Sequence, residues 1–465
     1  MTIRKLHVKD IRGKHVHLVG IGGSGMSGIA RIMASEGVNV SGSDSKDSSV
    51  LSGLRALGVK TIVGHSSENI LGADFLVYST AISRSNPEII EAERLAIPRL
   101  SRAQALAILM SESTSVAVAG THGKTTTTSM LTVALQSAGE DPSFAIGGVL
   151  KASGSNAHKG SGSIFIAEAD ESDGSFIEYH PYGAIITNIE HDHVDFFETP
   201  TEVAQAFAEF ASTISSDGFL VYCRDDTGAT TLAAEVPLSR KLSYGTDSQA
   251  DLRIDQVELL PSGSQSRVLW QGLSAGKLNL QVPGFHNVLN AAGALTAGLA
   301  LGVDTSELLA GLSTFRGTSR RFEFKGQVEG IRVIDDYGHH PTEIRVTLDT
   351  AKRYATDGRV LVVFQPHRYS RTRAFTSAFA TALDKADQSW VLEIYGAGEA
   401  TIPGVSGSSI TKFMTHGKFE PNFLSVVTEV AETAQPGDVI LTLGAGDVSS
   451  LAPLILDSLS KKYAK

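Results

Sequence analysis

The segment AVAGTHGKTTTT, residues 117–128, has the residue types that bind a nucleoside triphosphate. Its glycines let backbone N–H groups turn toward phosphate oxygens, Lys124 can neutralise the outer phosphates, and the Thr125 hydroxyl can bind Mg²⁺. The strict P-loop spacing requires a glycine where this chain has Val118, so the loop is a shortened variant. The alternative that involves no nucleotide is a glycine turn before a threonine-capped helix.

A second glycine-rich segment, HLVGIGGSGMSGIA at residues 17–30, follows the pattern of a dinucleotide-binding loop. Gly20, Gly22 and Gly25 form G-x-G-x-x-G, and Asp44 follows 19 residues after the last of them. This pattern alone predicts NAD or another phosphorylated ligand. Because one nucleoside triphosphate needs only one phosphate loop, we expect the two loops to hold different molecules.

Acidic and histidine side chains follow the strands predicted after the P-loop. Glu168 ends an apolar run, and a carboxylate beside a P-loop fits a Mg²⁺ ligand because this ion prefers hard oxygens. Glu171 and Asp173 are better explained as a solvated acidic loop. His193, in TNIEHDHVDFF, stands at a strand end next to the predicted nucleotide site, so we expect a functional role for it.

Two further segments carry side chains suited to anionic or nucleotide ligands. GFHNVLNAAGAL places His286, Asn287 and Asn290 on one helical face, where the amides can bind adenine or simply cap and pack the helix. Arg321 and the arginine before it can reach nucleotide phosphates or form a solvated surface pair.

The segment FQPHRYSRTR, residues 364–373, has three arginines within six residues. Arg368, Arg371 and Arg373 can together hold a carboxylate or a phosphate through paired N–H donors. His339 and His340, in IDDYGHHPTEI, are less specific. We expect both segments to follow strands of one sheet.

Short apolar runs alternate with longer helical patterns along the chain, which predicts an α/β fold. Ligands collect at the carboxyl ends of parallel strands, and the polar segments described above follow such runs. We expect three domains: an N-terminal Rossmann-like domain (1–111), a central P-loop ATPase-like domain (112–320), and a C-terminal Rossmann-like domain (321–465). The central domain should contain a parallel sheet with a small antiparallel insertion at 251–282, and 315–326 should act as a hinge.

Composition narrows the classes of function. The 465 residues are 42% hydrophobic and carry a net charge of −10, which disfavours a nucleic-acid partner because a basic surface is needed to release counterions. The single cysteine, Cys223, cannot form a disulfide within the chain. The first residues are too polar for a signal peptide, and no apolar run reaches 18 residues. We therefore expect a cytoplasmic enzyme without a membrane partner.

The ordered motifs GTHGKTT, EADESD, NIEHDHVD, H-N-x-x-N, DDYGHHPTE and FQPHRYSRT resemble those of the Mur ligases along essentially the whole chain. The resemblance implies an ATP-dependent amide ligase of peptidoglycan precursor synthesis. It implies that L-alanine is joined to the lactyl carboxylate of UDP-N-acetylmuramate through an acyl phosphate, with ATP and Mg²⁺ as cofactors. It also implies that the N-terminal glycine loop binds UDP rather than NAD.

The resemblance assigns roles to residues motif by motif. The implied catalytic residues are Lys124, Glu168, His193, Arg368 and Arg371. The implied magnesium ligands are Thr125, Glu168 and His193. The implied ATP-binding residues are Gly120, Thr121, His122, Gly123, Lys124, Thr125, Thr126, His286, Asn287, Asn290, Arg321 and Asp335. The implied UDP-substrate residues are Gly22, Gly23, Ser24, Gly25, Asp44, Ser79, Tyr337 and His339.

Three other functions would each account for part of the sequence. An NAD-dependent dehydrogenase would leave the P-loop unexplained, and a nucleotide-binding regulator would bind ATP without releasing phosphate. The recycling ligase that attaches a tripeptide to the same sugar nucleotide differs around the first glycine loop, at Ser172 and in PHRYSRT, so the residues here favour alanine addition. We expect a monomer or a weak homodimer.

Overall fold

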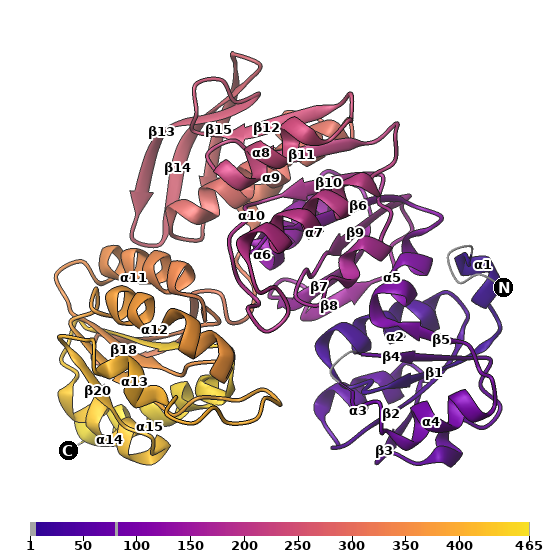
Figure 1. Cartoon of the computed structure of the whole chain (residues 1–465). Coiled ribbons are helices and arrows are strands. Elements are labelled where there is room, and N and C mark those ends of the chain that lie inside the picture. The colour runs from indigo at the N-terminus through magenta and orange to yellow at the C-terminus, as the bar shows by residue number, and fades with distance from the viewer. Residues whose placement is uncertain (1–5, 80–81, 465) are drawn as a thin grey trace.

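The computed structural model describes residues 6–79 and 82–464, and it consists of three α/β units that follow one another along the chain (Figure 1). Their sheets have five, ten and six strands among the described residues. In Figure 1 the central unit, in magenta, lies above the first unit in indigo and the third in orange and yellow. The α/β class with three units is therefore confirmed. No helix in the described ranges combines the length and the apolar character that crossing a bilayer requires.

The first unit is a parallel sheet with strand order β3-β2-β1-β4-β5. Its strands are β1 (His15–Val19), β2 (Asn39–Asp44), β3 (Lys60–Val63), β4 (Phe75–Tyr78) and β5 (Arg99–Ser101). Its helices are α1 (Val8–Ile11), α2 (Ser24–Ser35), α3 (Ser49–Ala56), η2 (Ser67–Ile70), α4 (Pro87–Arg94) and α5 (Arg102–Met110). The apolar residues of β1 are buried because helices cover both faces of the sheet.

The second unit is one mixed sheet with order β15-β14-β13-β12-β11-β10-β6-β9-β7-β8. Its strands are β6 (Thr114–Ala119), β7 (Ser143–Leu150), β8 (Ser155–His158), β9 (Ile164–Glu168), β10 (Gly183–Ile186), β11 (Phe219–Cys223), β12 (Lys241–Gly245), β13 (Leu252–Leu260), β14 (Gly263–Trp270) and β15 (Leu273–Leu280). Its helices are α6 (Lys124–Ser137), η3 (Ser175–Glu178), α7 (Pro200–Ser212), α8 (Thr227–Glu235), α9 (Phe285–Ala300) and α10 (Thr305–Thr314).

The predicted antiparallel insertion is confirmed as strands β13 to β15, which extend the main sheet because β12 pairs with β13. The β7–β8 hairpin at the opposite edge was not predicted. It packs against α2 of the first unit, where Asn156 donates a hydrogen bond to the carbonyl of Ser24 (2.6 Å).

The third unit has strand order β16-β17-β21-β18-β19-β20, parallel except for the antiparallel pair β16–β17. Its strands are β16 (Glu323–Val328), β17 (Ile331–Asp336), β18 (Val360–Phe364), β19 (Gln388–Val391), β20 (Gly417–Phe419) and β21 (Val439–Leu443). Its helices are α11 (Pro341–Ala355), α12 (Tyr369–Leu383), α13 (Gly407–Thr411), α14 (Phe423–Thr433), η4 (Asp447–Ser450) and α15 (Leu451–Tyr463).

The buried apolar side chains connect the units unequally. One cluster of buried residues continues from the first unit, including Leu106, into the second, including Phe176 and Phe207. The buried clusters of the third unit, on the two faces of its sheet, contain described residues of that unit alone. The third unit therefore contacts the second mainly through polar groups, which are described below.

Candidate active site

The P-loop follows β6 and leads directly into α6, as its sequence predicts. Gly120 and Gly123 have φ angles of +135° and +83°, which a residue with a side chain rarely adopts. A Cβ at Gly120 would also collide with the Thr187 hydroxyl, and one at Gly123 with Asn290. The loop therefore needs both glycines to present the N-terminus of α6, whose free N–H groups and dipole favour phosphate.

Lys124 is paired with a carboxylate that was interpreted as part of a solvated loop. Its Nζ donates to Glu171 Oε1 (2.9 Å) and to the carbonyls of Gly120 and Thr121. Glu171 is buried, and it also lies 3.4 Å from His193 Nε2. Burial opposes the charge of His193, but the hydrogen bond with Glu171 and the nearby charge of Asp192 raise its pKa. The interpretation of Glu171 as solvated was wrong.

Thr125 and Glu168 fit a magnesium site by their chemistry. The Thr125 hydroxyl donates to Glu168 Oε1 (2.8 Å), and the backbone N–H of Gly147 donates to Oε2 (2.7 Å). A hydroxyl and a carboxylate oxygen in contact are hard donors of the kind that Mg²⁺ binds beside a phosphate. His193, the third predicted ligand, contacts Glu171 rather than Glu168 in the structure.

Replacing Glu168 with glutamine is expected to weaken the response to Mg²⁺. Glu168→Gln keeps an oxygen for the Thr125 hydroxyl but removes the charge that attracts the ion, so half-maximal activity should need at least about tenfold more Mg²⁺. Phosphate release measured across a Mg²⁺ series checks this. Glu140→Gln, at an exposed position, is the control, and an unchanged Mg²⁺ requirement in Glu168→Gln would remove this residue from the metal site.

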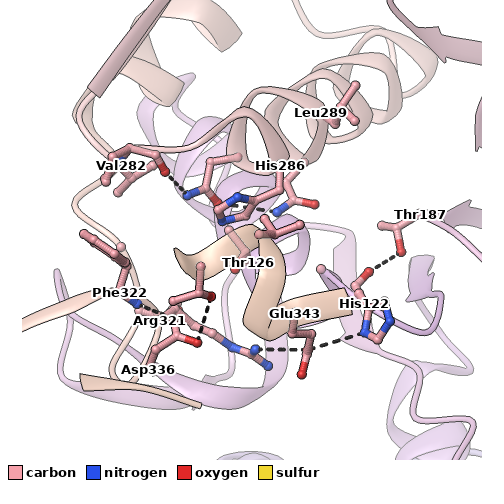
Figure 2. A pocket seen from close by; sticks show the side chains of 18 of the residues that line it. His122, Thr126, Thr187, Val282, His286, Leu289, Arg321, Phe322, Asp336 and Glu343 are labelled. Carbon is pink, nitrogen blue, oxygen red and sulfur yellow. Dashed lines mark hydrogen bonds and ion pairs between the residues drawn. The ribbon is translucent and has the colours of Figure 1, made fainter. Parts of the chain in front are cut away.

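A cavity of about 430 Å³, which we call the P-loop cavity, opens beside the start of α6 (Figure 2). Of the predicted ATP-binding residues, those that line it are His122, Gly123, Thr126, His286, Asn287, Asn290 and Arg321. The third unit closes the cavity with Phe322, Asp336 and Glu343. The cavity therefore has walls from two units.

Asp335, predicted to bind ATP, does not line this cavity. Successive side chains of β17 point to opposite faces, so Asp335 hydrogen-bonds Thr442 (2.7 Å) and Arg320 while Asp336 faces the cavity. Asp336 accepts the backbone N–H groups of Phe322 and Gly338, and burial raises its pKa to about 6. Of these two neighbouring aspartates of β17, Asp336 is the one that lines the cavity.

A second cavity of about 500 Å³, the glycine-loop cavity, lies over the N-terminal glycine loop. Of the predicted residues, those that line it are Gly23, Ser24, Gly25, Asp44, Ser79, Glu168 and Arg368. Asp44 accepts a hydrogen bond from the backbone N–H of Gly22 (2.9 Å), so its carboxylate helps to fix the backbone of the glycine loop. Tyr337 and His339 are not among its lining residues: both rings lie beside each other in the third unit, near His367.

A buried carboxylate supports the strand that carries Asp44. Glu88 accepts hydrogen bonds from Ser43 (2.6 Å) and Asn69 (2.5 Å) and lies 3.9 Å from His17 Nε2. Burial alone would raise the pKa of Glu88, but these hydrogen bonds and His17 hold it at about 2, below its ordinary value of 4.5. The ionised carboxylate is thus stabilised by folding.

Glu88→Gln should therefore destabilise the chain in a pH-dependent way. Since folding lowers the pKa of Glu88, its stabilisation is present above about pH 4.5 and is lost as the pH falls toward 2. The free energy of unfolding at pH 7 should drop by up to about 3 kcal/mol, and the difference from wild type should shrink below pH 4.5. Urea denaturation at pH 7 and at a pH below 4.5 measures this difference. Glu93→Gln, exposed on the same helix, should change little, and a difference in Glu88→Gln that is independent of pH would contradict the assignment.

The arginines of α12 connect the third unit to the second. Arg371 donates to Asp192 Oδ1 (2.9 Å), and the side chains are only 3% and 4% exposed. Burial would raise the pKa of Asp192, but Arg371 holds it far below its ordinary range. Arg368 pairs with Asp195 and reaches the glycine-loop cavity, whereas Arg373 is exposed. The three arginines therefore do not form one anion-binding cluster.

The linings of the two cavities approach each other at the start of α6. Thr126 lines the P-loop cavity, while Glu168, hydrogen-bonded to the adjacent Thr125, lines the glycine-loop cavity. Lys124 lies at the same junction. Neighbouring side chains at the start of α6 therefore connect the lining of one cavity to that of the other.

Comparisons with known proteins identify the family. Residues 15–114 match the Mur ligase family catalytic domain, residues 118–298 the Mur ligase middle domain, and residues 320–446 the Mur ligase glutamate ligase domain. The chain belongs to the Mur ligase family. This Mur ligase is 48% identical over 454 residues to the UDP-N-acetylmuramate–L-alanine ligase of Renibacterium salmoninarum, covering 96% of each chain. It is also 48% identical to the ligase of that name from Saccharopolyspora erythraea, covering 97% of this chain and 94% of the relative.

Solved Mur ligase structures share the three-unit architecture. The UDP-N-acetylmuramate–alanine ligase of Thermotoga maritima matches with a TM-score of 0.80 and 30% identity, covering 97% of this chain and 100% of the other. A murein peptide ligase from Psychrobacter arcticus matches with a TM-score of 0.74 and 26% identity, covering 96% and 99%. Both members of the family thus have the overall fold of this chain.

Sequence reasoning missed several residues of this Mur ligase site. Glu343 contacts His122 (3.4 Å) and Arg321 (3.6 Å), and thereby joins the P-loop to the third unit. Asp192 and Glu171 were noticed but were not assigned to the site. The capping box at the start of α11 could have indicated Glu343. Asp192 and Glu171 could have been inferred because a buried arginine or lysine requires a carboxylate as its counterion.

Proposed function

We propose that this chain joins L-alanine to the lactyl carboxylate of UDP-N-acetylmuramate, with conversion of ATP to ADP and phosphate, in peptidoglycan precursor synthesis. The observation that carries this proposal is the contact of Thr125 with Glu168, which stands between a cavity beside the P-loop and a cavity over the glycine loop. The high identity to ligases of that name over the whole chain supports the choice of substrates. We assign the reaction to the cytoplasm.

The proposed reaction proceeds in two steps, phosphoryl transfer and then amide formation. A carboxylate oxygen attacks the γ-phosphorus of ATP, the bond to the β-phosphate oxygen breaks, and ADP leaves. The neutral amine of L-alanine then attacks the acyl phosphate carbon, loses a proton, and phosphate departs as the tetrahedral intermediate collapses to the amide. ATP is needed because a free carboxylate would have to expel an oxide, which is a poor leaving group. The first step converts the carboxylate into an acyl phosphate, from which phosphate leaves readily.

The side chains at the junction stabilise charge in this scheme. Phosphoryl transfer depends mainly on positioning and on neutralising phosphate oxygens. Lys124 supplies a positive charge at the P-loop, and Thr125 and Glu168, with His193 nearby, would hold Mg²⁺, which would supply further positive charge for the phosphate oxygens. His286, whose pKa burial lowers to about 4, is neutral and with Asn287 and Asn290 is suited to the adenine and ribose.

Each unit is assigned one of the three substrates. We assign residues 1–111 to the UDP-sugar, 112–320 to ATP and 321–465 to L-alanine, and we propose that 315–326 bends when the third unit closes over the acyl phosphate and excludes water. The middle of the linker contacts both neighbouring units, because the backbone N–H of Ser319 donates to the carbonyl of Val149 in β7 and the Arg320 side chain donates to the carbonyl of Gly444 in the third unit. X-ray scattering that showed no compaction with an ATP analogue and the UDP-sugar would contradict this closure.

One experiment separates the proposal from its alternatives. Phosphate release is measured with ATP, Mg²⁺ and UDP-N-acetylmuramate plus L-alanine, glycine, L-serine or a tripeptide in turn. We expect the highest kcat/KM with L-alanine, whereas preference for the tripeptide would indicate the recycling ligase. No phosphate release with any acceptor would overturn the proposal, and fluorescence transfer to bound NADH would support a dehydrogenase.

A further inference from the structure

We propose that Glu399 is a positioning residue, which holds Arg368 in the glycine-loop cavity and thereby lets the third unit take part in binding the UDP-sugar. The role rests on the proposed function, since the ligand of this cavity there is the UDP-sugar. Among the described residues that line the cavity, Arg368 is the one that belongs to the third unit. Glu399 is not in that lining, so it acts through Arg368.

The charges of the glycine-loop cavity make the position of Arg368 important. Its described lining contains four carboxylates and two cations, namely Asp44, Glu168, Asp170, Asp173, Arg102 and Arg368. A UDP-sugar brings further negative charge, so a cation has to lie where it can offset this charge. Arg102 lies 3.5 Å from the carboxylate of Asp170. Arg368 is therefore the positive charge that the third unit adds to an acidic cavity.

The backbone of Arg368 is held in an unusual conformation. Arg368 is the N-cap residue of α12, with a φ of +71° and a ψ of +137°. A residue with a side chain keeps such angles only where its surroundings stabilise them. The backbone N–H of Arg368 donates to the carbonyl of Tyr395 (2.8 Å), and the backbone N–H of Tyr395 donates to the carbonyl of Pro366 (2.9 Å). The loop after β19 thus fixes the chain on both sides of His367.

Glu399 caps α12 in place of the N-cap side chain. An arginine side chain has no acceptor atom, so Arg368 cannot bind the free N–H groups at the start of its own helix. Glu399 accepts the backbone N–H of Ser370 (3.0 Å) with Oε2 and the Ser370 hydroxyl (2.6 Å) with Oε1. Its negative charge also lies at the positive end of the helix dipole. Without Glu399, the first turn of α12 loses this cap, and Arg368 is free to relax to an ordinary φ.

A tight backbone turn brings Glu399 to the helix. The backbone N–H of Glu399 donates to the carbonyl of Gly396 (2.9 Å), and the two residues between them, Ala397 and Gly398, have φ angles of +50° and +88°. A Cβ at Gly396 would lie 3.1 Å from the ring of Tyr369, the first residue of α12. The turn therefore packs closely against the helix whose start it caps.

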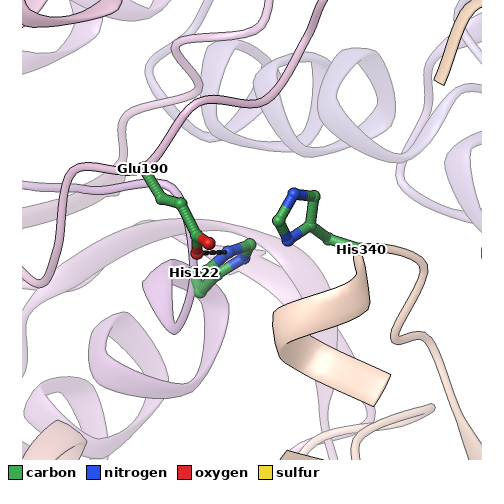
Figure 3. A group of neighbouring side chains, drawn as sticks. All are labelled: His122, Glu190 and His340. Carbon is green, nitrogen blue, oxygen red and sulfur yellow. Dashed lines mark hydrogen bonds and ion pairs between the residues drawn. The ribbon is translucent and has the colours of Figure 1, made fainter. Parts of the chain in front are cut away.

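The contact between the second and third units at the P-loop does not involve the glycine-loop cavity. There one oxygen of Glu190 accepts the Thr342 hydroxyl (2.7 Å), and the other lies 2.9 Å from His122 Nε2 (Figure 3). These three residues line the P-loop cavity, and none of them is in the described lining of the glycine-loop cavity. Loss of Glu399 should therefore affect the UDP-sugar and leave ATP binding unchanged.

Kinetics and calorimetric binding of UDP-N-acetylmuramate test the proposal. Arg368→Ala and Glu399→Ala should each lower kcat/KM for the UDP-sugar and weaken its binding at least about tenfold, while the KM for ATP stays at its wild-type value. Glu399→Gln keeps an oxygen for the backbone N–H of Ser370, so it should recover part of the loss. Glu432→Ala, at an exposed position on α14, is the control and should behave as wild type. Thermal unfolding confirms that each variant is folded.

The double variant shows whether Glu399 acts through Arg368. In the Arg368→Ala background, Glu399→Ala should cause no further loss, because the side chain that it positions is gone. Losses that multiply, or a Glu399→Ala variant that matches Glu432→Ala, would overturn the proposal.

A crystal structure of Glu399→Ala examines the position of Arg368 without any substrate. We expect Arg368 to leave the positive-φ region and its side chain to withdraw from the glycine-loop cavity. An unchanged Arg368 would overturn the positioning role even in an active ligase. Wild-type protein that releases no phosphate would overturn the proposed function instead, and the crystal structure would still decide the role of Glu399.

Discussion

Lys124→Ala is expected to lower kcat for ADP formation by at least about 10²–10³-fold, because it removes the positive charge from the junction of the two cavities. Binding of the UDP-sugar should change little, since Lys124 does not line the glycine-loop cavity. The measurement is ADP release at saturating substrates. Lys277→Ala, at an exposed position on β15, is the matched control and should retain wild-type turnover.

The effect of Lys124→Ala on stability must be distinguished from its effect on catalysis. Lys124→Ala leaves the buried Glu171 without its main partner, so the variant should also unfold at a lower temperature. Adding Glu171→Gln removes the unpaired charge and should restore part of the stability without restoring turnover. A folded Lys124→Ala variant with near-normal turnover would exclude this lysine from the mechanism.

Arg371→Ala should cause the largest loss of stability among the contacts between the second and third units. It leaves the buried Asp192 uncompensated, and removing one partner of a buried ion pair costs about 3–5 kcal/mol. Denaturation should show the loss, and phosphate release should fall because the third unit docks less often. Arg373→Ala, exposed on the same helix, should have little effect on either measurement.

A double-mutant cycle isolates the pair from other effects of the substitution. Asp192→Asn in the Arg371→Ala background removes the buried charge, so the double variant should be more stable than the sum of the two single losses predicts. Strictly additive losses, or a loss no larger than that of Arg373→Ala, would show that this pair does not hold the units together.

The sequence predicted the fold and the loops well because these depend on local patterns. The strand before Gly120 ends in the apolar run 116–119, the strand before the N-terminal glycine loop is buried apart from its first residue, and each glycine loop stands directly before a helix. The β7–β8 hairpin escaped prediction because its burial alternates irregularly and part of it is covered by α2 of another unit. Pairing across units has no local signal.

The site was predicted less completely for the same reason. His122, His286 and Thr126, which are predicted to bind ATP, all line the P-loop cavity, since they lie near the loop in one unit. Asp336 was missed because a shift of one residue along β17 reverses the face that a side chain occupies. Tyr337 and His339 are predicted at the UDP-substrate site, and in the structure their rings lie beside each other without lining the glycine-loop cavity.

The unequal packing of the three units has a consequence for how the molecule moves. Apolar contacts continue from the first unit into the second, whereas Arg368, Arg371 and Glu343 attach the third through charges. The partly exposed pair of Arg368 with Asp195 weakens with ionic strength, whereas the buried pair of Arg371 with Asp192 is screened less and buried apolar contacts are not weakened. Residues up to about 320 should therefore move as one body, and added salt should shift the molecule toward an open form from which ADP escapes.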